Sequence, residues 1–233
     1  MYSEMPIMTT MLTTYEDFVA RVESLGFMTL SPLLPGLPSL GGETAESLWH
    51  TGLETDPWRW KDRVAEEKRL AYGCILGKHK GFVTRRMYPI FYAAFHPTLA
   101  MSERWTRGTV SQRTWQLWQL FEERGTLNIS QVRQILGVSG KQGTGAVDTA
   151  IRQLQHEYYI TVDGNDRKVN AKGEFYGWPV NRYCRVVDWV PVDWLESAKD
   201  WSVEEARESI LDNGVAMSDD VSRQDLAKKF GLR

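Results

Sequence analysis

Apolar residues recur at three- and four-residue steps along residues 109–125, and this spacing predicts an amphipathic helix. Its apolar positions are Trp115, Leu117, Trp118 and Phe121. Thr109 or Ser111 is a suitable N-cap, because a hydroxyl can accept a hydrogen bond from the first-turn backbone. Gly125 is a suitable C-terminal residue, because glycine adopts the left-handed conformation that ends many helices.

Two further helices are predicted downstream. Residues 127–138 contain an apolar stripe of Val132, Ile135 and Leu136 after a candidate N-cap at Ser130. Residues 139–158 begin with glycine-rich turn chemistry and then place Val147, Ile151 and Leu154 at positions i, i+4 and i+7. The three apolar faces must be buried together, which predicts a compact core of three helices.

A strand pair is predicted immediately after the third helix. Residues 158–162 are aromatic and β-branched, as strand residues are, and Asp-Gly-Asn-Asp at 163–166 has the composition of a turn. Arg167 and Lys168 then leave this turn on the return strand. The order helix, helix, helix, hairpin is that of a winged helix-turn-helix.

The rest of the chain is predicted to be mainly helical. Helices are expected at 13–26, 55–73, 84–97, 202–214 and 222–232, with a strand at 181–190. The expected fold is therefore mainly α with a small β-hairpin. We expect a helical N-terminal region with a Trp-rich helix at 1–103, a winged helix-turn-helix at 104–190, and an acidic helical tail at 191–233.

Composition excludes several classes of protein. Apolar residues make up 42% of the chain, no apolar run is long enough to span a membrane, and the N-terminus has no secretion signal, so we expect a cytoplasmic protein. Cys74 and Cys184 lie too far apart to indicate a disulfide framework. The four histidines show no zinc-binding spacing. The sequence therefore predicts neither a metal nor a cofactor.

The charge distribution points to DNA. Residues 104–186 carry twelve Lys or Arg against seven Asp or Glu, which gives this segment a net charge of +5. The whole chain has a net charge of −2, so the remaining residues together have a net charge of −7. A basic module in an acidic chain is typical of phosphate contact. We expect double-stranded DNA to bind the third helix and the hairpin, with Gln142 and Thr144 as base readers. The predicted DNA-binding residues are Lys141, Gln142, Thr144, Arg152, Gln155, Arg167, Lys168 and Lys172.

Two alternatives remain open at this point. A winged helix can instead bind a protein partner, or its basic face can be covered by the acidic segment 196–212. In the Trp-rich helix, Trp58 or Trp60 could stack on an extruded base while a nearby carboxylate positions water. The competing interpretation is that both tryptophans are packing residues and that the carboxylates form a solvated helix face.

Four stretches carry a resemblance to a known family: DPWRWKDR, AEEKRLAYG, GFVTRRMYP and YGWPVNRYCRV. Over roughly residues 25–190 the chain resembles bacterial proteins described as AlkZ-related. These are distant relatives of the AlkZ-like DNA glycosylases, which excise alkylated bases or unhook interstrand crosslinks with tandem winged helices. The resemblance implies a winged-helix, DNA-associated protein linked to DNA repair.

The chain departs from the glycosylase pattern in two respects. Only one winged-helix unit is clear, whereas the enzymes have several. The enzymes use two glutamines around an apolar residue to activate water; Gln153-Leu154-Gln155 has these letters, but positions i and i+2 of a helix point to different sides. We therefore expect a DNA-binding protein rather than an enzyme, with a glycosylase that hydrolyses N-glycosidic bonds as the alternative.

Overall fold

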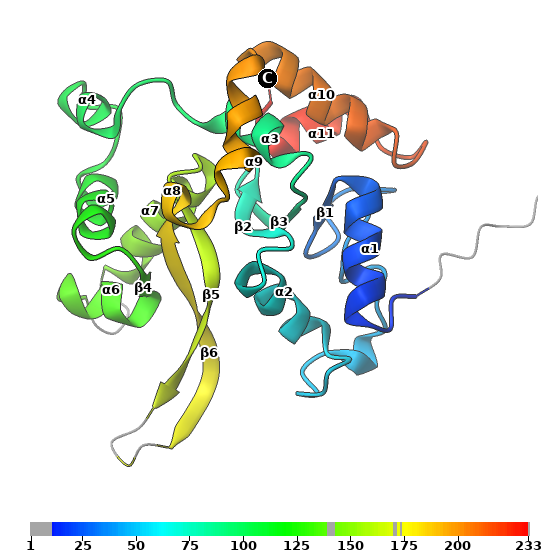
Figure 1. Ribbon diagram of the computed structural model, residues 1–233, viewed down its shortest axis with the longest axis horizontal. Helices are drawn as coiled ribbons and strands as arrows, with labels where there is room; N and C mark the ends of the chain where they lie inside the picture. The colour runs from blue at the N-terminus through cyan, green and yellow to red at the C-terminus, as the bar shows by residue number, and fades with distance from the viewer. Residues whose placement is uncertain (1–10, 139–142, 170–171, 173, 233) are drawn as a thin grey trace, which may run out of the picture.

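The computed structural model describes residues 11–138, 143–169, 172 and 174–232 (Figure 1). In this part of the chain the fold is mainly α-helical with two small antiparallel sheets, as the sequence predicts. The longer helices are α1 (Tyr15–Leu25), α2 (Pro57–Glu66), α3 (Tyr88–Phe95), α5 (Gln112–Arg124), α7 (Thr144–His156), α10 (Val203–Val215) and α11 (Arg223–Phe230). The shorter ones are α4 (Met101–Thr106), α6 (Ile129–Ile135), α8 (Val186–Trp189), α9 (Val192–Glu196), η1 (Glu46–Leu48) and η2 (Ser197–Asp200).

The first sheet has the order β1-β3-β2 and was not expected from the sequence. It comprises β1 (Phe27–Thr29), β2 (Ala71–Leu76) and β3 (His79–Val83). The predicted helix at 55–73 is wrong beyond Glu66, where the chain turns through Lys68 at φ 54° and enters β2. Every residue of β2 is buried, so the strand lacks the polar–apolar alternation that would have revealed it.

The second sheet has the order β4-β6-β5, from β4 (Leu127–Asn128), β5 (Ile160–Val169) and β6 (Phe175–Arg185). Along the chain, these three strands alternate with three helices in the order α5, β4, α6, α7, β5, β6. The hairpin of β5 and β6 is longer than predicted and projects from the body of the molecule (Figure 1).

The predicted turn at 163–166 is wrong, because β5 runs through it to Val169. Gly164 lies at a register shift of the ladder rather than in a turn. Arg182 of β6 bonds across the hairpin to Asp163 at 2.9 Å and to Asp166 at 3.2 Å. The two carboxylates therefore hold the paired strands together.

Two apolar cores stabilise the fold. The first joins Phe18, Trp60 and Phe82 of the N-terminal part to Phe121 and Leu154 of the three-helix region. The second gathers apolar side chains of α3, α10 and α11 with the end of β6; among its members are Phe27, Phe91, Tyr158, Cys184, Ile210, Leu226 and Phe230.

The acidic tail packs against α3 through α10, at the end of the molecule opposite the hairpin tip (Figure 1). Its buried side chains include Ala206, Ile210 and Leu211. In the described part of the chain, the segment 196–212 thus contributes α10 to the packing on α3, and the alternative that it covers the basic face of the third helix gains no support from this contact. No helix in the described part of the chain has the length and apolar character needed to cross a membrane.

Candidate nucleic-acid interface

The residues predicted to contact DNA are distributed between α7 and the hairpin. Lys141 and Gln142 lie outside the described residues. Thr144 is half-buried in the first turn of α7, and Lys172 is exposed in the connection between β5 and β6. Lys168 lies on β5, where its backbone pairs with Tyr176 of β6.

Gln155 requires a correction, because it lies inside the protein with an exposed fraction of 3%. Its Oε1 accepts a hydrogen bond from the backbone N–H of Cys74 at 3.0 Å, and its amide nitrogen donates to the carbonyl of Ile151 at 3.3 Å. Gln155 thus joins α7 to β2. Any Cβ at Gly73 would lie 2.7 Å from this Oε1, so a larger residue there would displace the Gln155 amide from its bond to Cys74.

Arg152 is exposed on α7 and lies next to Cys74 of β2. Burial raises the pKa of the Cys74 thiol, while the charges of Lys80 and Arg152 act in the opposite direction. Lys80 of β3 also acts on the buried pair Lys61 and Asp62 of α2. These effects place the two exposed cations on the side of the molecule where α7 adjoins the first sheet.

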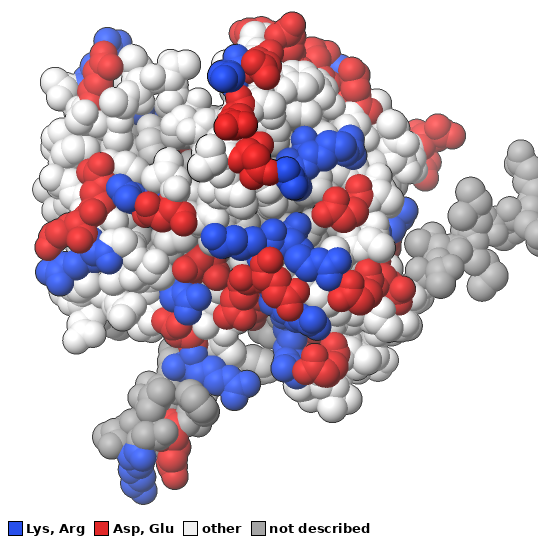
Figure 2. All heavy atoms as spheres, in the orientation of Figure 1, with Lys and Arg blue, Asp and Glu red and all other residues white. Residues whose placement is uncertain are grey.

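Many of the Lys and Arg side chains of residues 104–186 pair with carboxylates of the protein itself. Among the described residues, ion pairs engage at least six of this segment's twelve cations: Arg104, Arg107, Arg124, Arg133, Arg182 and Arg185. Figure 2 shows Lys and Arg interspersed with Asp and Glu over the described residues of the face that carries the hairpin. Net charge alone therefore overstated the number of cations available to phosphate.

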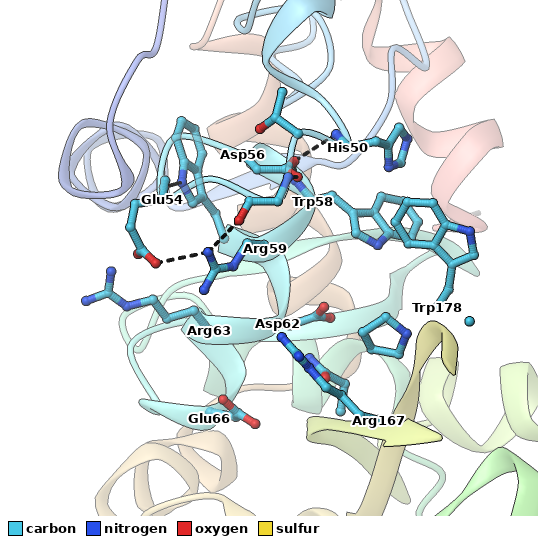
Figure 3. Close-up of a pocket in the computed structure, with 16 residues that line it drawn as sticks. His50, Glu54, Asp56, Trp58, Arg59, Asp62, Arg63, Glu66, Arg167 and Trp178 are labelled. Atoms are coloured by element: carbon cyan, nitrogen blue, oxygen red, sulfur yellow. Dashed lines mark hydrogen bonds and ion pairs between the residues drawn. The ribbon is translucent and has the colours of Figure 1, made fainter. Parts of the chain in front are cut away.

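Arg167 lines a cleft between α2 and the outer half of the hairpin (Figure 3). The cleft has a volume of about 890 Å³. Its walls come from the segment around His50, from α2, and from both hairpin strands, including Asn165 and Trp178. Because β5 continues past the predicted turn, Arg167 faces this cleft rather than leaving a hairpin tip.

Asp56 fixes the wall of the cleft formed by α2. It is the N-cap of this helix, is 2% exposed, and accepts from the N–H of Trp58 at 2.9 Å. The same carboxylate accepts from the N–H groups of His50 at 3.0 Å and Gly52 at 2.9 Å. These bonds hold His50 at φ 63°, a left-handed conformation that non-glycine residues rarely adopt.

A buried ion pair lies behind this wall. Lys61 is 4% exposed and donates to the carboxylate of Asp62, which is 6% exposed and lines the cleft. Burial lowers the pKa of Lys61 and raises the pKa of Asp62, and each partner opposes the shift of the other. The ammonium of Lys61 also lies 4.3 Å from the centre of the Trp58 ring, a cation–π contact that fixes the indole.

Three aromatic rings meet at the other end of the cleft. The His50 ring lies 5.0 Å from Trp58 and 5.2 Å from Trp178, and the two indoles are 6.5 Å apart. Trp178 is 61% exposed, whereas Trp60 is 1% exposed and donates its indole N–H to the carbonyl of Glu54. Of the two tryptophans proposed from the sequence, Trp58 reaches the cleft face and Trp60 is mainly a packing residue.

Sequence reasoning missed His50 and Trp178. A local signal existed for Trp178, because Gly177 and Pro179 on either side of it are typical of a bulge in a strand, and the structure has a register shift there. Gly177 has a φ of 65°. The contact between this tryptophan and α2 could not be predicted, because the two elements are far apart in sequence.

The Gln153-Leu154-Gln155 segment does not present two glutamines to one site. Leu154 is fully buried. Gln153 accepts from the hydroxyl of Thr114 at 3.0 Å and donates to Glu157 at 3.1 Å, while Gln155 bonds to β2 on the other side of the helix. The two amides are committed to different neighbours, so this segment is structural. Among the described residues, no cluster of three or more His, Cys, Asp or Glu is placed to hold a metal ion.

The family model described as AlkZ related matches residues 12–231 of this chain. The match spans nearly the whole sequence, so the chain belongs to the AlkZ-related family. A search of curated proteins and a search of solved structures each found no match.

Proposed function

We propose that this AlkZ-related protein binds double-stranded DNA through a winged helix and acts in DNA repair. The observation that carries the proposal is the order α5, β4, α6, α7, β5, β6 together with the sheet order β4-β6-β5. This arrangement of three helices and a three-stranded sheet, with a long final hairpin, supports a winged helix, in which the last helix of the three would enter the major groove. The family relationship supports a role in repair.

In this proposal α7 is the recognition helix. Its second half packs on β2 through Gln155, so the surface open to a major groove comes from its first half and from Arg152. Exposed positions in that half include Gly145, Ala146 and Thr149. These short side chains would let the helix approach the duplex closely. Arg152 and Lys172 would contact phosphates from the helix and from the hairpin.

Fluorescence anisotropy of a labelled duplex tests the proposal at several salt concentrations. We expect affinity to fall steeply with salt, with a slope of about −0.9 per phosphate contact. The double variant Arg152→Ala, Lys172→Ala should weaken binding and reduce the slope by about 2. A matched control removes two exposed cations of the tail region, Lys199→Ala and Lys228→Ala. Absence of binding at low salt, or equal loss in the two double variants, would overturn the proposal.

A further inference from the structure

We propose that the cleft between α2 and the hairpin binds an unpaired nucleobase of a DNA strand, with Trp178 as the stacking surface. The inference rests on the proposed function, because it assumes that the chain engages DNA. It adds a second contact, separate from the recognition helix, and it names the chemical form of DNA that this contact takes.

Trp178 is the first reason. An indole with 61% of its surface exposed leaves a large apolar face in water. It lies in a bulge of β6, at a register shift of the ladder, and the strand pairs with β5 on either side of this bulge, with Val180 opposite Asp166 and Tyr176 opposite Lys168. His50 and Trp58 contact its ring from the α2 side (Figure 3). A positioned, exposed indole in a cleft is typical of sites where a base stacks.

The rigidity of the opposite wall is the second reason. Asp56 ties His50 and Trp58 together through backbone hydrogen bonds, and Lys61 fixes the Trp58 ring. An aromatic site that is formed before the ligand arrives loses little conformational entropy on binding. The cleft volume of about 890 Å³ lies within the range of small-molecule sites, which suits a base with its sugar.

The polar groups of the cleft match a nucleotide. The Asp62 carboxylate points toward the Trp178 side of the cleft and can accept from the amino or imino N–H groups of a base (Figure 3). Asn165, on the β5 wall, offers both a donor and an acceptor. Arg59 and Arg63 stand at the rim on the exposed face of α2, each in an ion pair with a nearby glutamate, and the phosphates of the same strand would replace these carboxylates as partners of the two arginines.

These features do not suit an apolar protein segment. Apolar side chains offer no donor to the Asp62 carboxylate, which is 6% exposed and already accepts from Lys61, whereas a base supplies amino or imino N–H groups. In a fully paired duplex, every Watson–Crick edge and both base faces are occupied. The cleft therefore recognises a base that has left its pair, whether extruded from a duplex or present in a single strand.

The experiment compares three labelled probes by anisotropy at matched salt: a fully paired duplex, the same duplex with one bulged base, and a single strand. We expect the bulged duplex to bind more tightly than the paired one. Trp178→Ala should remove this preference and weaken binding to the bulged probe by about 5- to 150-fold, the range for loss of one base–aromatic stack. Its affinity for the paired duplex should not change.

Trp105→Ala is the matched control, because Trp105 is 38% exposed and lies on α4, outside the cleft. A bulge that contains 2-aminopurine gives a second readout, since stacking on Trp178 should quench its emission in the wild type and not in Trp178→Ala.

The outcomes separate the two proposals. Salt-sensitive binding to the paired duplex, with no gain for the bulge and no effect of Trp178→Ala, would overturn the cleft inference alone. Trp178-dependent binding to the single strand without binding to the paired duplex would support the cleft and overturn the proposed function. Equal losses in Trp178→Ala and Trp105→Ala on the bulged probe would also overturn the cleft inference.

Discussion

Replacement of Asp56 by alanine should destabilise the whole protein and disorganise the cleft wall. The Asp56 carboxylate is 2% exposed and accepts three backbone hydrogen bonds, from His50, Gly52 and Trp58, at 2.9–3.0 Å. One bond caps α2, and the other two hold the preceding loop against the helix. Alanine removes all three acceptors at once.

The magnitude follows from these three bonds. Loss of the N-cap alone costs about 1 kcal/mol. Each of the two loop N–H groups loses its acceptor, which costs about 1 to 3 kcal/mol, and the exposed loop can recover part of this by admitting water. With about 1 kcal/mol for each loop N–H, the free energy of unfolding should fall by about 3 kcal/mol. For a chain of this size, the midpoint of thermal unfolding should fall by roughly 6–12 °C.

Urea unfolding followed by circular dichroism measures this change, and an unchanged m-value would show that the same surface is exposed on unfolding. Ser202→Ala is the reference variant, because Ser202 is an exposed cap that serves α10 by accepting from the N–H of Glu205. We expect that variant to lose about 1 kcal/mol. If Asp56→Ala lost no more than Ser202→Ala, the three bonds would not act as described.

Three further predictions concern the contacts that join the parts of the fold. Gln155→Leu leaves the buried N–H of Cys74 without its acceptor and should lower the free energy of unfolding by about 1 to 3 kcal/mol, measured in urea; a neutral result would contradict the contact. Gly77→Ala places a Cβ 2.2 Å from the Phe230 Cα at a φ of 57° and should cost at least about 2 kcal/mol, with thermal unfolding as the measurement. Burial lowers the pKa of His156 from 6.5 to about 4, so the folded protein keeps this group neutral where the unfolded chain takes up a proton. Stability should therefore fall as pH decreases from about 6.5 to about 4, by up to about 3 kcal/mol, and His156→Gln should show a smaller fall in urea titrations at each pH.

Helix starts could be predicted well, because the signals that set them are local. Ser111, one of the two caps predicted for the helix at 109–125, caps α5 in the structure, and side chains of the same kind, Thr14, Asp56 and Ser202, cap α1, α2 and α10. The exception is α6, for which Ser130 was predicted as the N-cap. The observed N-cap is Asn128, which forms a capping box with Gln131. A side chain that bonds a backbone N–H two or three residues away needs no tertiary information.

Helix ends and buried strands were harder to predict. Gly214 was expected to end the tail helix, but α10 continues to Val215. Gly214 packs against Leu226 from within the helix, and a Cβ at this position would lie 2.3 Å from Cδ2 of Leu226. The strand expected at 181–190 ends at Arg185, and α8 follows. At Gly214 a contact with a residue of another helix decides the local structure, and the amino-acid pattern around the position does not record it.

The candidate site shows the same limit. Trp58 could be proposed because a tryptophan-rich helix with carboxylates is visible in one segment. Trp178 and His50 could not be joined to it, since the contact depends on the length of the hairpin, and that length was underestimated when 163–166 was interpreted as a turn. Because of the same error, Arg167 was predicted to lie near a hairpin tip, whereas in the structure it lines the cleft.

Strand β2 links the cleft to α7, the helix that we propose enters the major groove. It pairs with β3 in the first sheet, and its backbone N–H at Cys74 donates to Gln155 of α7. Its carbonyl at Ile75 accepts from the hydroxyl of Tyr158 at 3.2 Å, just before β5 begins. On the other side, the indole N–H of Trp189 reaches the carbonyl of Ala65 in α2 at 3.1 Å. Buried bonds of this kind resist independent motion of α2 and α7. A duplex held by α7 would therefore meet the cleft in one fixed orientation, so that the cleft could select an unpaired base at a constant distance from the groove contact.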